Sequence, residues 1–481
     1  MTKTWFIICI ILYELVEILT CNLNKKGFIM KIKLALAACI VTLPLVGVAV
    51  TLEETVKEVL NTNPQVLERI NYFRSVKQDV GIAESGYYPK IDIVAGIGRE
   101  RTNNRGTSFN NVHLYREEAG VILSQNLFEG FGTQNYVNKQ LYRVSSAAYS
   151  VIEQANQTSL SMIEAYTELF KQKELLGSAE ANVETHKKIN SKIQERIDSG
   201  VGANSELEQS SSRLALAESN LIVQMNNYED AISKFIKVYG SFVHPDDLEE
   251  PMALSTLPTS RSQAIAEASK LNPSLKVQRA NIKVAKSNYN LTEKNFYPRF
   301  DIEARQDWNK NVGGVNGNDY SASIMLKMRY NLYNGNADTA NKQKSISELH
   351  QEMRVLEDLQ RRVEESIRLS WMAYTTLDKQ IGYLKTHKEL SEKTLTSYVE
   401  EFNLGRRTLL DILDTEEEMY SADRELVTAK YDHMLAQYRI IESIGTLSSA
   451  IDAGFADIVG LGEEMSSKAE VTDVLPQEEQ K

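Results

Sequence analysis

Apolar residues recur at helical spacing along two long stretches of the chain. They step by threes and fours through Met162, Tyr166, Leu169, Ile367, Trp371, Tyr374, Leu377, Ile381 and Leu384. Proline, which breaks helices, is absent from 90–244 and from 299–475. We therefore predict one long helix over 133–199 and a second over 336–403, each about 100 Å long at about 1.5 Å per residue.

A shorter helix is expected on either side of each long one. Turns at Gly200 and Gly405 end the long helices, and Asn-Pro pairs bend or break the helices that precede the strands. The predicted short helices cover 52–86, 205–239, 262–295 and 408–447. Two short helices placed end to end match one long helix, so each half of the chain can form a two-stranded antiparallel coiled coil. A filamentous coiled coil is the alternative that the helical pattern leaves open.

Between these helices the apolar pattern changes to a period of two. Two such segments flank a glycine-rich turn over 313–317, and two weaker ones lie in the first half of the chain. Their apolar residues are Phe300, Ile302, Ala304, Trp308, Tyr320, Ala322, Ile324, Leu326, Met328, Tyr330 and Leu332, and earlier Ile91, Ile93, Ala95, Ile97, Tyr115, Ala119, Val121, Leu123 and Leu127. Segments of about ten residues with one apolar and one ionic face are typical of strands that cross an outer membrane. A half-buried sheet in a water-soluble domain is the alternative.

The ionic face of these strands predicts an aqueous lumen. It carries Asp301, Glu303, Arg305, Lys327 and Arg329. Four strands cannot close a barrel, and an open edge in lipid would leave backbone N–H and C=O groups unpaired. Two chains would supply eight strands and a filled interior, whereas three would supply twelve with room for a lumen. We therefore expect an α+β membrane protein whose transmembrane β-barrel is shared between chains and continues into a long periplasmic α-helical coiled-coil barrel.

The two halves of the chain are copies of one unit. Matched positions lie about 209 residues apart up to the first strand and about 205 residues apart after the hairpin. Examples are Asn63-Pro64 with Asn272-Pro273, Tyr88-Pro89 with Tyr297-Pro298, Asn126-Leu127 with Asn331-Leu332, and Gly200 with Gly405. The change in offset places a length difference in a hairpin loop between Ile93 and Asn126. We predict a first repeat over 50–245, a linker over 246–260 and a second repeat over 261–450.

The first 49 residues are interpreted as a leader. A basic start at Met30, an apolar run over 34–48 and small residues before position 50 predict a secretory signal. The biological start is then either Met30 or Met1, with 1–29 as an extended leader. All three cysteines of the chain lie in this leader, and Cys39 follows a lipoprotein-like Leu-Ala-Ala sequence. An exported chain with no other cysteine fits a bacterial envelope.

Charge and the scattered histidines limit the function classes. A net charge of −11 at pH 7 disfavours nucleic acid or anionic lipid as the main partner. The sequence has no phosphate-binding loop and no nucleophile elbow, and its six histidines lack metal-ligand spacing, so we interpret them as surface residues. We expect no enzyme activity, no metal and no other cofactor. The acidic segment 451–481 is expected to be a mobile periplasmic tail.

One segment is specific enough to indicate a family. Residues 404–414 read Leu-Gly-Arg-Arg-Thr-Leu-Leu-Asp-Ile-Leu-Asp, and with 88–92 and 126–128 they resemble the TolC family of trimeric outer-membrane channels. The resemblance covers about 50–450. It implies a homotrimer surrounded by outer-membrane lipid, working with a periplasmic adaptor and an inner-membrane transporter, here of ABC type. The Gly-Arg-Arg-Thr-Leu-Leu-Asp form of 405–411 and segment 98–102 are similar to the branch that serves type I secretion, including adhesin exporters.

The resemblance also implies a gate. In the family, links between neighbouring helix pairs hold the periplasmic mouth nearly closed, and acidic rings line the constriction. The matching positions here are Arg407 as the basic link, Ser205 and Glu206 as its partners, and Asp411 and Asp414 as the rings. Such rings predict cation selectivity, and helix-start carboxylates favoured by the helix dipole are the alternative. Phe402 replaces a tyrosine, so one expected hydrogen bond cannot form and we expect a more weakly held closed state.

The same resemblance suggests where an adaptor docks and what the chain does. Gly200, Val201, Leu404 and Gly405 resemble the family's docking turns, although ordinary helix termination by glycine also explains them. We expect an outer-membrane exit channel of a tripartite export system, most like type I protein secretion. A drug or metal efflux channel would share every feature described above. A periplasmic adaptor or structural rod would lack the strands.

Overall fold

The computed structural model describes residues 50–254, 257–452 and 455. The chain divides into two units, Met1–Ala49 and Val50–Lys481. The predicted leader, with Cys39, therefore lies outside the described residues, as does nearly all of the predicted tail. No described helix is long and apolar enough to cross a membrane.

Both helices that precede the strands are broken at an Asn-Pro pair, as predicted. The pieces are α3 (Leu52–Thr62), α4 (Pro64–Glu84), α7 (Arg261–Leu271) and α8 (Pro273–Thr292). The side chains of Asn63 and Asn272 cap the second piece of each pair, and a proline follows in the first helical position. Proline is tolerated there because the N–H it lacks would have no partner within the helix.

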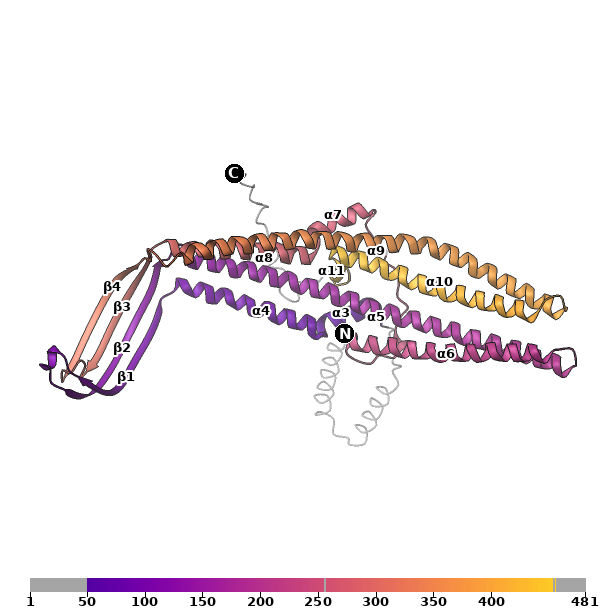
Figure 1. Cartoon of the computed structure of the whole chain (residues 1–481), viewed down its shortest axis with the longest axis horizontal. Helices are drawn as coiled ribbons and strands as arrows, with labels where there is room; N and C mark the ends of the chain where they lie inside the picture. The colour runs from indigo at the N-terminus through magenta and orange to yellow at the C-terminus, as the bar shows by residue number, and fades with distance from the viewer. Residues whose placement is uncertain (1–49, 255–256, 453–454, 456–481) are drawn as a thin grey trace, which may run out of the picture. The chain divides into compact units, whose positions relative to one another are not determined.

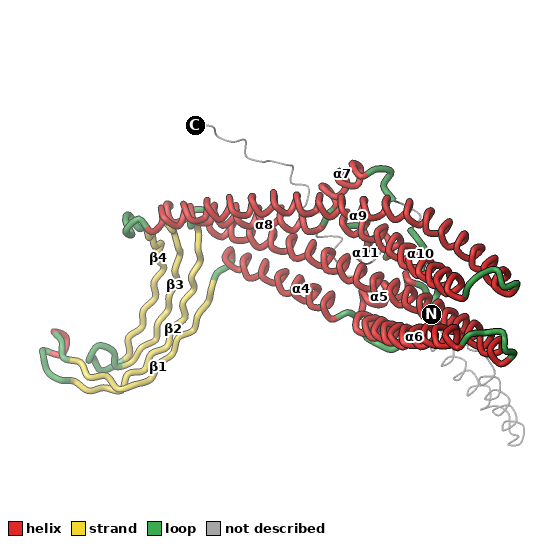
Figure 2. Tube along the Cα trace, turned by 45° about the vertical axis from the view of Figure 1, so that its right-hand side comes forward, coloured by secondary structure: helices red, strands yellow, loops and turns green. Residues whose placement is uncertain are grey.

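Two helices of 67 residues dominate the fold (Figure 1). They are α5 (Gly132–Asp198) and α9 (Ala337–Asn403), and each turns back into a helix of 36 residues, α6 (Asn204–Tyr239) or α10 (Leu409–Ile444). Figure 2 shows α6 running along α5 and α10 running along α9, which gives two antiparallel coiled coils. The fourth predicted helix continued to 447. It ends earlier because Gly445 has a φ of 92°, and a short helix, α11 (Leu447–Ile451), follows.

The four strands form one antiparallel sheet in chain order. They are β1 (Lys90–Thr102), β2 (Val112–Phe128), β3 (Arg299–Lys310) and β4 (Asn318–Arg329). The turn between β3 and β4 contains the predicted glycine-rich segment 313–317, and the turn between β1 and β2 lies between Ile93 and Asn126, where the change in offset placed a hairpin loop. Tyr330 and Leu332, which the alternation placed in the last strand, lie beyond its end at Arg329.

The sheet has one apolar and one ionic face, and neither edge strand has an outer partner. Ile97 of β1 and Ile324 of β4 are 84% and 81% exposed on the apolar face. In the described chain the sheet order begins at β1 and ends at β4, so each presents a row of unpaired backbone groups. In a single chain the apolar face of the sheet is therefore exposed, and backbone N–H and C=O groups of both edge strands lack partners in the sheet.

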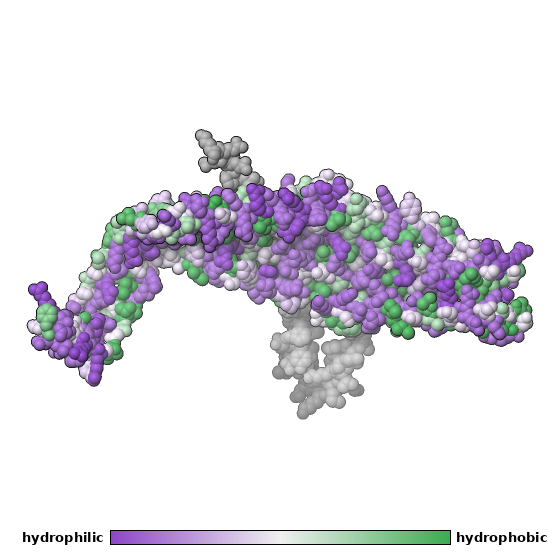
Figure 3. All heavy atoms as spheres, viewed as in Figure 1, coloured by the Kyte–Doolittle hydropathy of each residue, from purple (hydrophilic) through white to green (hydrophobic). Residues whose placement is uncertain are grey.

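The main core lies where the short helices pack on the middle of α5. Tyr166 is fully buried there, and its hydroxyl donates hydrogen bonds toward the backbone C=O groups of Val50 and Glu249. These contacts tie the first described residue and the linker segment to α5. The visible face of the helices in Figure 3 is mostly hydrophilic with scattered apolar residues, as expected for helices whose apolar stripe is turned inward.

Candidate functional site

The turns that join α5 to α6 and α9 to α10 end the two coiled coils (Figure 1). Gly200 and Gly405 have φ of 76° and 73°, a conformation that strains residues with a Cβ atom. Beside them, Val201 and Leu404 are 72% and 70% exposed. Exposed apolar side chains on well-defined turns fit a docking role for these four residues, which stays a prediction.

The two tips pack against each other through a small apolar cluster. Its buried members are Ile193, Phe402, Leu409, Ile412 and Leu413. The guanidinium of Arg196 on α5 lies over the ring of Phe402 on α9, 4.6 Å from the ring centroid. A cation held over an aromatic face is attracted by the ring quadrupole. This contact joins the coiled coils where the tyrosine hydroxyl is missing, and the sequence analysis did not find Arg196.

Arg407 has partners in its own helix pair. Its Nε atom lies 2.7 Å from Oε2 of Glu401, and its guanidinium carbon lies 4.1 Å from the centroid of the Tyr398 ring. The hydrogen bond to Glu401 raises the pKa of Arg407 above its usual value. Within the described chain no hydrogen bond or ion pair joins Arg407 to Ser205 or Glu206, which begin α6.

The turn at Gly405 accounts for these contacts of Arg407. Arg407 comes two residues after Gly405, so its side chain folds back over the end of α9 rather than reaching across to α6. The predicted link from Arg407 to Ser205 and Glu206 stays a prediction.

The two aspartates of the motif have separate partners. Asp411 forms a capping box with Thr408: its carboxylate accepts from the Thr408 N–H at 3.1 Å and from the hydroxyl at 2.8 Å. These bonds, with the charge of Arg407, lower the pKa of Asp411. Asp414 lies 3.3 Å from the guanidinium of Arg213 on α6. Asp411 thus has the helix-start role that was the alternative to a ring, and acidic rings stay a prediction.

One histidine corrects the interpretation that all six lie at the surface. His186 of α5 is 3% exposed, and its Nε2 atom lies 2.9 Å from Oε2 of Glu416 on α10. Asn182 donates to the other carboxylate oxygen at 2.8 Å. The helical spacing contained a usable signal, because positions 182 and 186 continue the buried row of Leu175 and Ala179.

The five predicted lumen residues share one face of the sheet. The register places Asp301 opposite Lys327 and Arg299 opposite Arg329, and Glu303 and Arg305 fall on the same side by alternation. Glu303 pairs with Lys327 at 2.6 Å. The sheet therefore carries a continuous ionic surface, as the period of two predicted.

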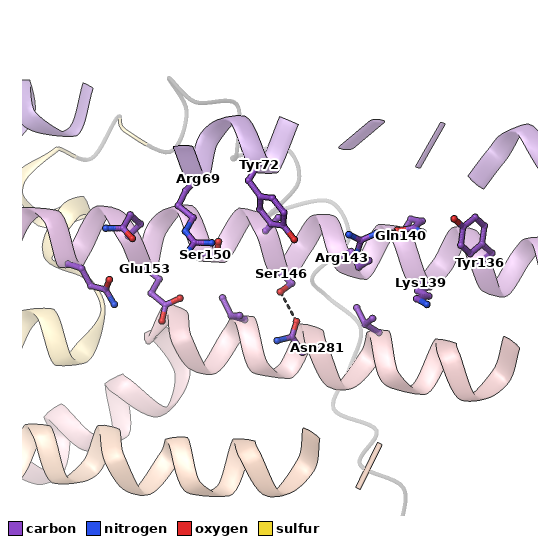
Figure 4. A pocket seen from close by; sticks show the side chains of 15 residues that line it. Arg69, Tyr72, Tyr136, Lys139, Gln140, Arg143, Ser146, Ser150, Glu153 and Asn281 are labelled. Carbon is purple, nitrogen blue, oxygen red and sulfur yellow. Dashed lines mark hydrogen bonds between the residues drawn. The ribbon is translucent and has the colours of Figure 1, made fainter. Parts of the chain in front are cut away.

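A groove of about 860 Å³ runs along α5 between α4 and α8 (Figure 4). Its cations already have partners: Arg143 pairs with Asp79 at 3.0 Å, and Lys139 donates to Asn288 at 3.0 Å. Burial, with the charge of Arg143, lowers the pKa of Lys139. Because these groups are satisfied within the chain, the groove gives no sign of a bound substrate.

The arrangement of the repeats has a counterpart among known proteins. The sequence profile of the outer membrane efflux protein family matches residues 55–241 and 264–446, one match in each repeat. The chain belongs to this family. The two-repeat organisation inferred from the offsets is thereby confirmed.

Individual relatives agree with the family. Outer membrane efflux protein BepC of Brucella suis biovar 1 is 24% identical over 373 residues, covering 77% of this chain and 80% of BepC. Proteases secretion protein PrtF of Dickeya chrysanthemi is 21% identical over 385 residues, covering 77% of this chain and 83% of PrtF. The crystal structure of the outer membrane protein VceC from Vibrio cholerae has a TM-score of 0.72 at 14% identity, covering 82% of this chain and 96% of VceC.

Membership of the outer membrane efflux family establishes the general function of the chain. The chain is an outer-membrane channel for efflux or export that extends into the periplasm, and proteins of this kind are not enzymes. The predicted fold class and location are confirmed. The family profile alone does not assign the gate, docking and lumen residues.

Proposed function

We propose that three copies of this chain form the outer-membrane exit channel of a tripartite system, most like those of type I protein secretion. The observation that carries the proposal is the sheet with two open edges and an apolar outer face. Joining β1 of one chain to β4 of the next satisfies the edge N–H and C=O groups, and three chains give twelve strands. The ionic face then lines the lumen.

The helices continue this conduit toward the inner membrane. Three pairs of coiled coils form a hollow cylinder whose tips carry the gate residues and the turns at Gly200 and Gly405. A periplasmic adaptor docks on these turns, and an inner-membrane ABC transporter supplies the energy. Support for the gate comes from the contacts between α5, α9 and α10 at the tips.

Type I secretion is favoured by the likeness to PrtF, which is named for protease secretion, and by the motif over 404–414. Drug or metal efflux is the second candidate, because BepC is named an efflux protein. Purification of the native complex tests the choice. An ABC transporter recovered with the channel supports secretion, whereas a proton-driven pump would favour efflux.

Arg407→Ser is expected to raise the single-channel conductance in planar bilayers. The substitution removes the guanidinium that holds Glu401 and stacks on Tyr398, and with it any link to the neighbouring chain. The adjacent, exposed Arg406 provides the control, since Arg406→Ser removes the same charge from the same turn. Equal conductance in the two variants would show that Arg407 does not hold the gate closed.

Asp411→Asn combined with Asp414→Asn is expected to reduce cation preference. Carboxylates in a narrow pore attract cations, and asparagine removes the charge while keeping an oxygen that can accept from Thr408. Reversal potentials in a salt gradient measure the preference. The exposed Glu417 and Glu418 of the same helix, changed to glutamine, control for net charge. A reversal potential that moves no further than in this control would argue against the rings.

A further inference from the structure

The two coiled coils meet mainly where α10 packs on α5. The joint contains an apolar cluster of Leu175, Val427 and Tyr431, and Glu416 of α10 lies in the same joint with none of its surface exposed. A carboxylate taken out of water is retained only when it is paired or hydrogen-bonded. The groups that contact the Glu416 carboxylate therefore indicate its role.

Both partners of Glu416 come from the opposite coiled coil. Asn182 Nδ2 donates to Oε1 at 2.8 Å, and His186 Nε2 lies 2.9 Å from Oε2. Asn182 and His186 are themselves buried, at 6% and 3% exposure, and both lie on α5. Glu416 therefore keeps its hydrogen bond from Asn182 and its contact with His186 only while α5 and α10 stay together.

Neighbouring charged groups are engaged elsewhere. On α10, Asp414 pairs with Arg213 of α6, and Glu418 lies 3.3 Å from His387 of α9.

The Nδ1 atom of His186 is buried with no hydrogen-bond partner among the described residues. An unpaired buried nitrogen makes the closed packing less favourable than an apolar contact of the same shape would be.

We propose that Asn182, His186 and Glu416 form a clasp that positions the two coiled coils in the closed arrangement of the gate. The proposal rests on the function proposed above, since it assigns positioning residues to that gate. Buried ion pairs often stabilise a fold less than apolar packing does, and their best-attested use is to fix the register of one element against another. The clasp holds this register, and it releases when α10 moves away from α5 and water reaches the polar groups.

Three substitutions at neighbouring positions test the clasp. Glu416→Ala removes the acceptor of Asn182 and the carboxylate beside His186, and it is expected to raise single-channel conductance several-fold. Glu416→Gln retains an oxygen for His186 and, after rotation of the Asn182 amide, a second hydrogen bond, so it is expected to stay near the original conductance. Glu417→Ala removes an exposed carboxylate one position along and is expected to change nothing. Equal conductance in Glu416→Ala and Glu417→Ala would overturn the clasp.

A cross-linking experiment covers the case in which Glu416→Ala fails to assemble. The sequence beyond position 49 has no cysteine. Asn182→Cys combined with Glu416→Cys therefore places one thiol of that segment on α5 and one on α10, on either side of the joint. A short, reducible bifunctional thiol reagent is expected to lower the conductance, and reductant is expected to raise it again. Channels that are indifferent to cross-linking would overturn the clasp. Failure of the unaltered protein to form pores would instead contradict the proposed function.

Discussion

Replacing Ile324 by lysine is expected to prevent assembly of the channel in the outer membrane. Ile324 lies in the middle of β4, 81% exposed on the apolar face of the sheet. A lysine on the lipid face near the bilayer midplane costs about 2–4 kcal/mol. In a symmetric trimer the same cost applies to every chain, which is enough to block assembly of a barrel that must close between chains.

The neighbouring position is a matched control for this substitution. Ser323 points to the opposite, ionic face, where the register places it across from Arg305. Ser323→Lys therefore puts the same side chain on the face proposed to line the lumen and is expected to be tolerated. The trimer recovered from outer-membrane fractions, detected on a gel without heating, is the measurement. Equal yields from the two variants would show that the sheet is not oriented in lipid as proposed.

Gly445→Ala is expected to destabilise the fold by about 2–5 kcal/mol, combining left-handed backbone strain with overpacking. Gly445 has a φ of 92°, and a Cβ atom there would lie 2.2 Å from Cδ of Pro273 and 2.8 Å from Cα of Asn272. The same junction contains a hydrogen bond of 2.9 Å from Asn156 to the Gly445 C=O. Gly445 of the second repeat contacts Asn156 of the first repeat, so the substitution also disturbs the packing between the two repeats.

Gly382 is the control for the glycine substitution. It lies within α9, and a Cβ atom there would meet nothing within 4 Å. Gly382→Ala is expected to stabilise the protein by about 0.5–1 kcal/mol, because alanine loses less backbone entropy in a helix. Denaturant unfolding of the purified protein compares the two variants. A Gly445→Ala protein as stable as the original would contradict the packing described for this junction.

The elements of this fold are predictable because each is specified locally. Asn63 and Asn272 cap and break the short helices, Gly200 and Gly405 end the long ones, and alternation defines the strands. These signals depend on residues close together in the chain. The faces of the sheet follow from the same local rule, since a period of two puts every second residue on one side.

The contacts at the helix tips are a different case. The stacking of Arg196 on Phe402 depends on how each helix is rotated and how the two coiled coils approach each other. One residue of rotation moves a side chain by about 100° around a helix axis, at 3.6 residues per turn. A single sequence does not determine that rotation for residues more than two hundred positions apart, so neither the stacking of Arg196 on Phe402 nor the pairing of His186 with Glu416 was predicted.

The barrel is proposed to be sealed by strands that are shared between chains. Native mass spectrometry of the channel released from outer membranes, combined with bilayer recordings of the same preparation, tests it directly. We expect a complex of three identical chains that conducts ions. A single chain that stays dissolved without detergent and never forms pores would contradict it.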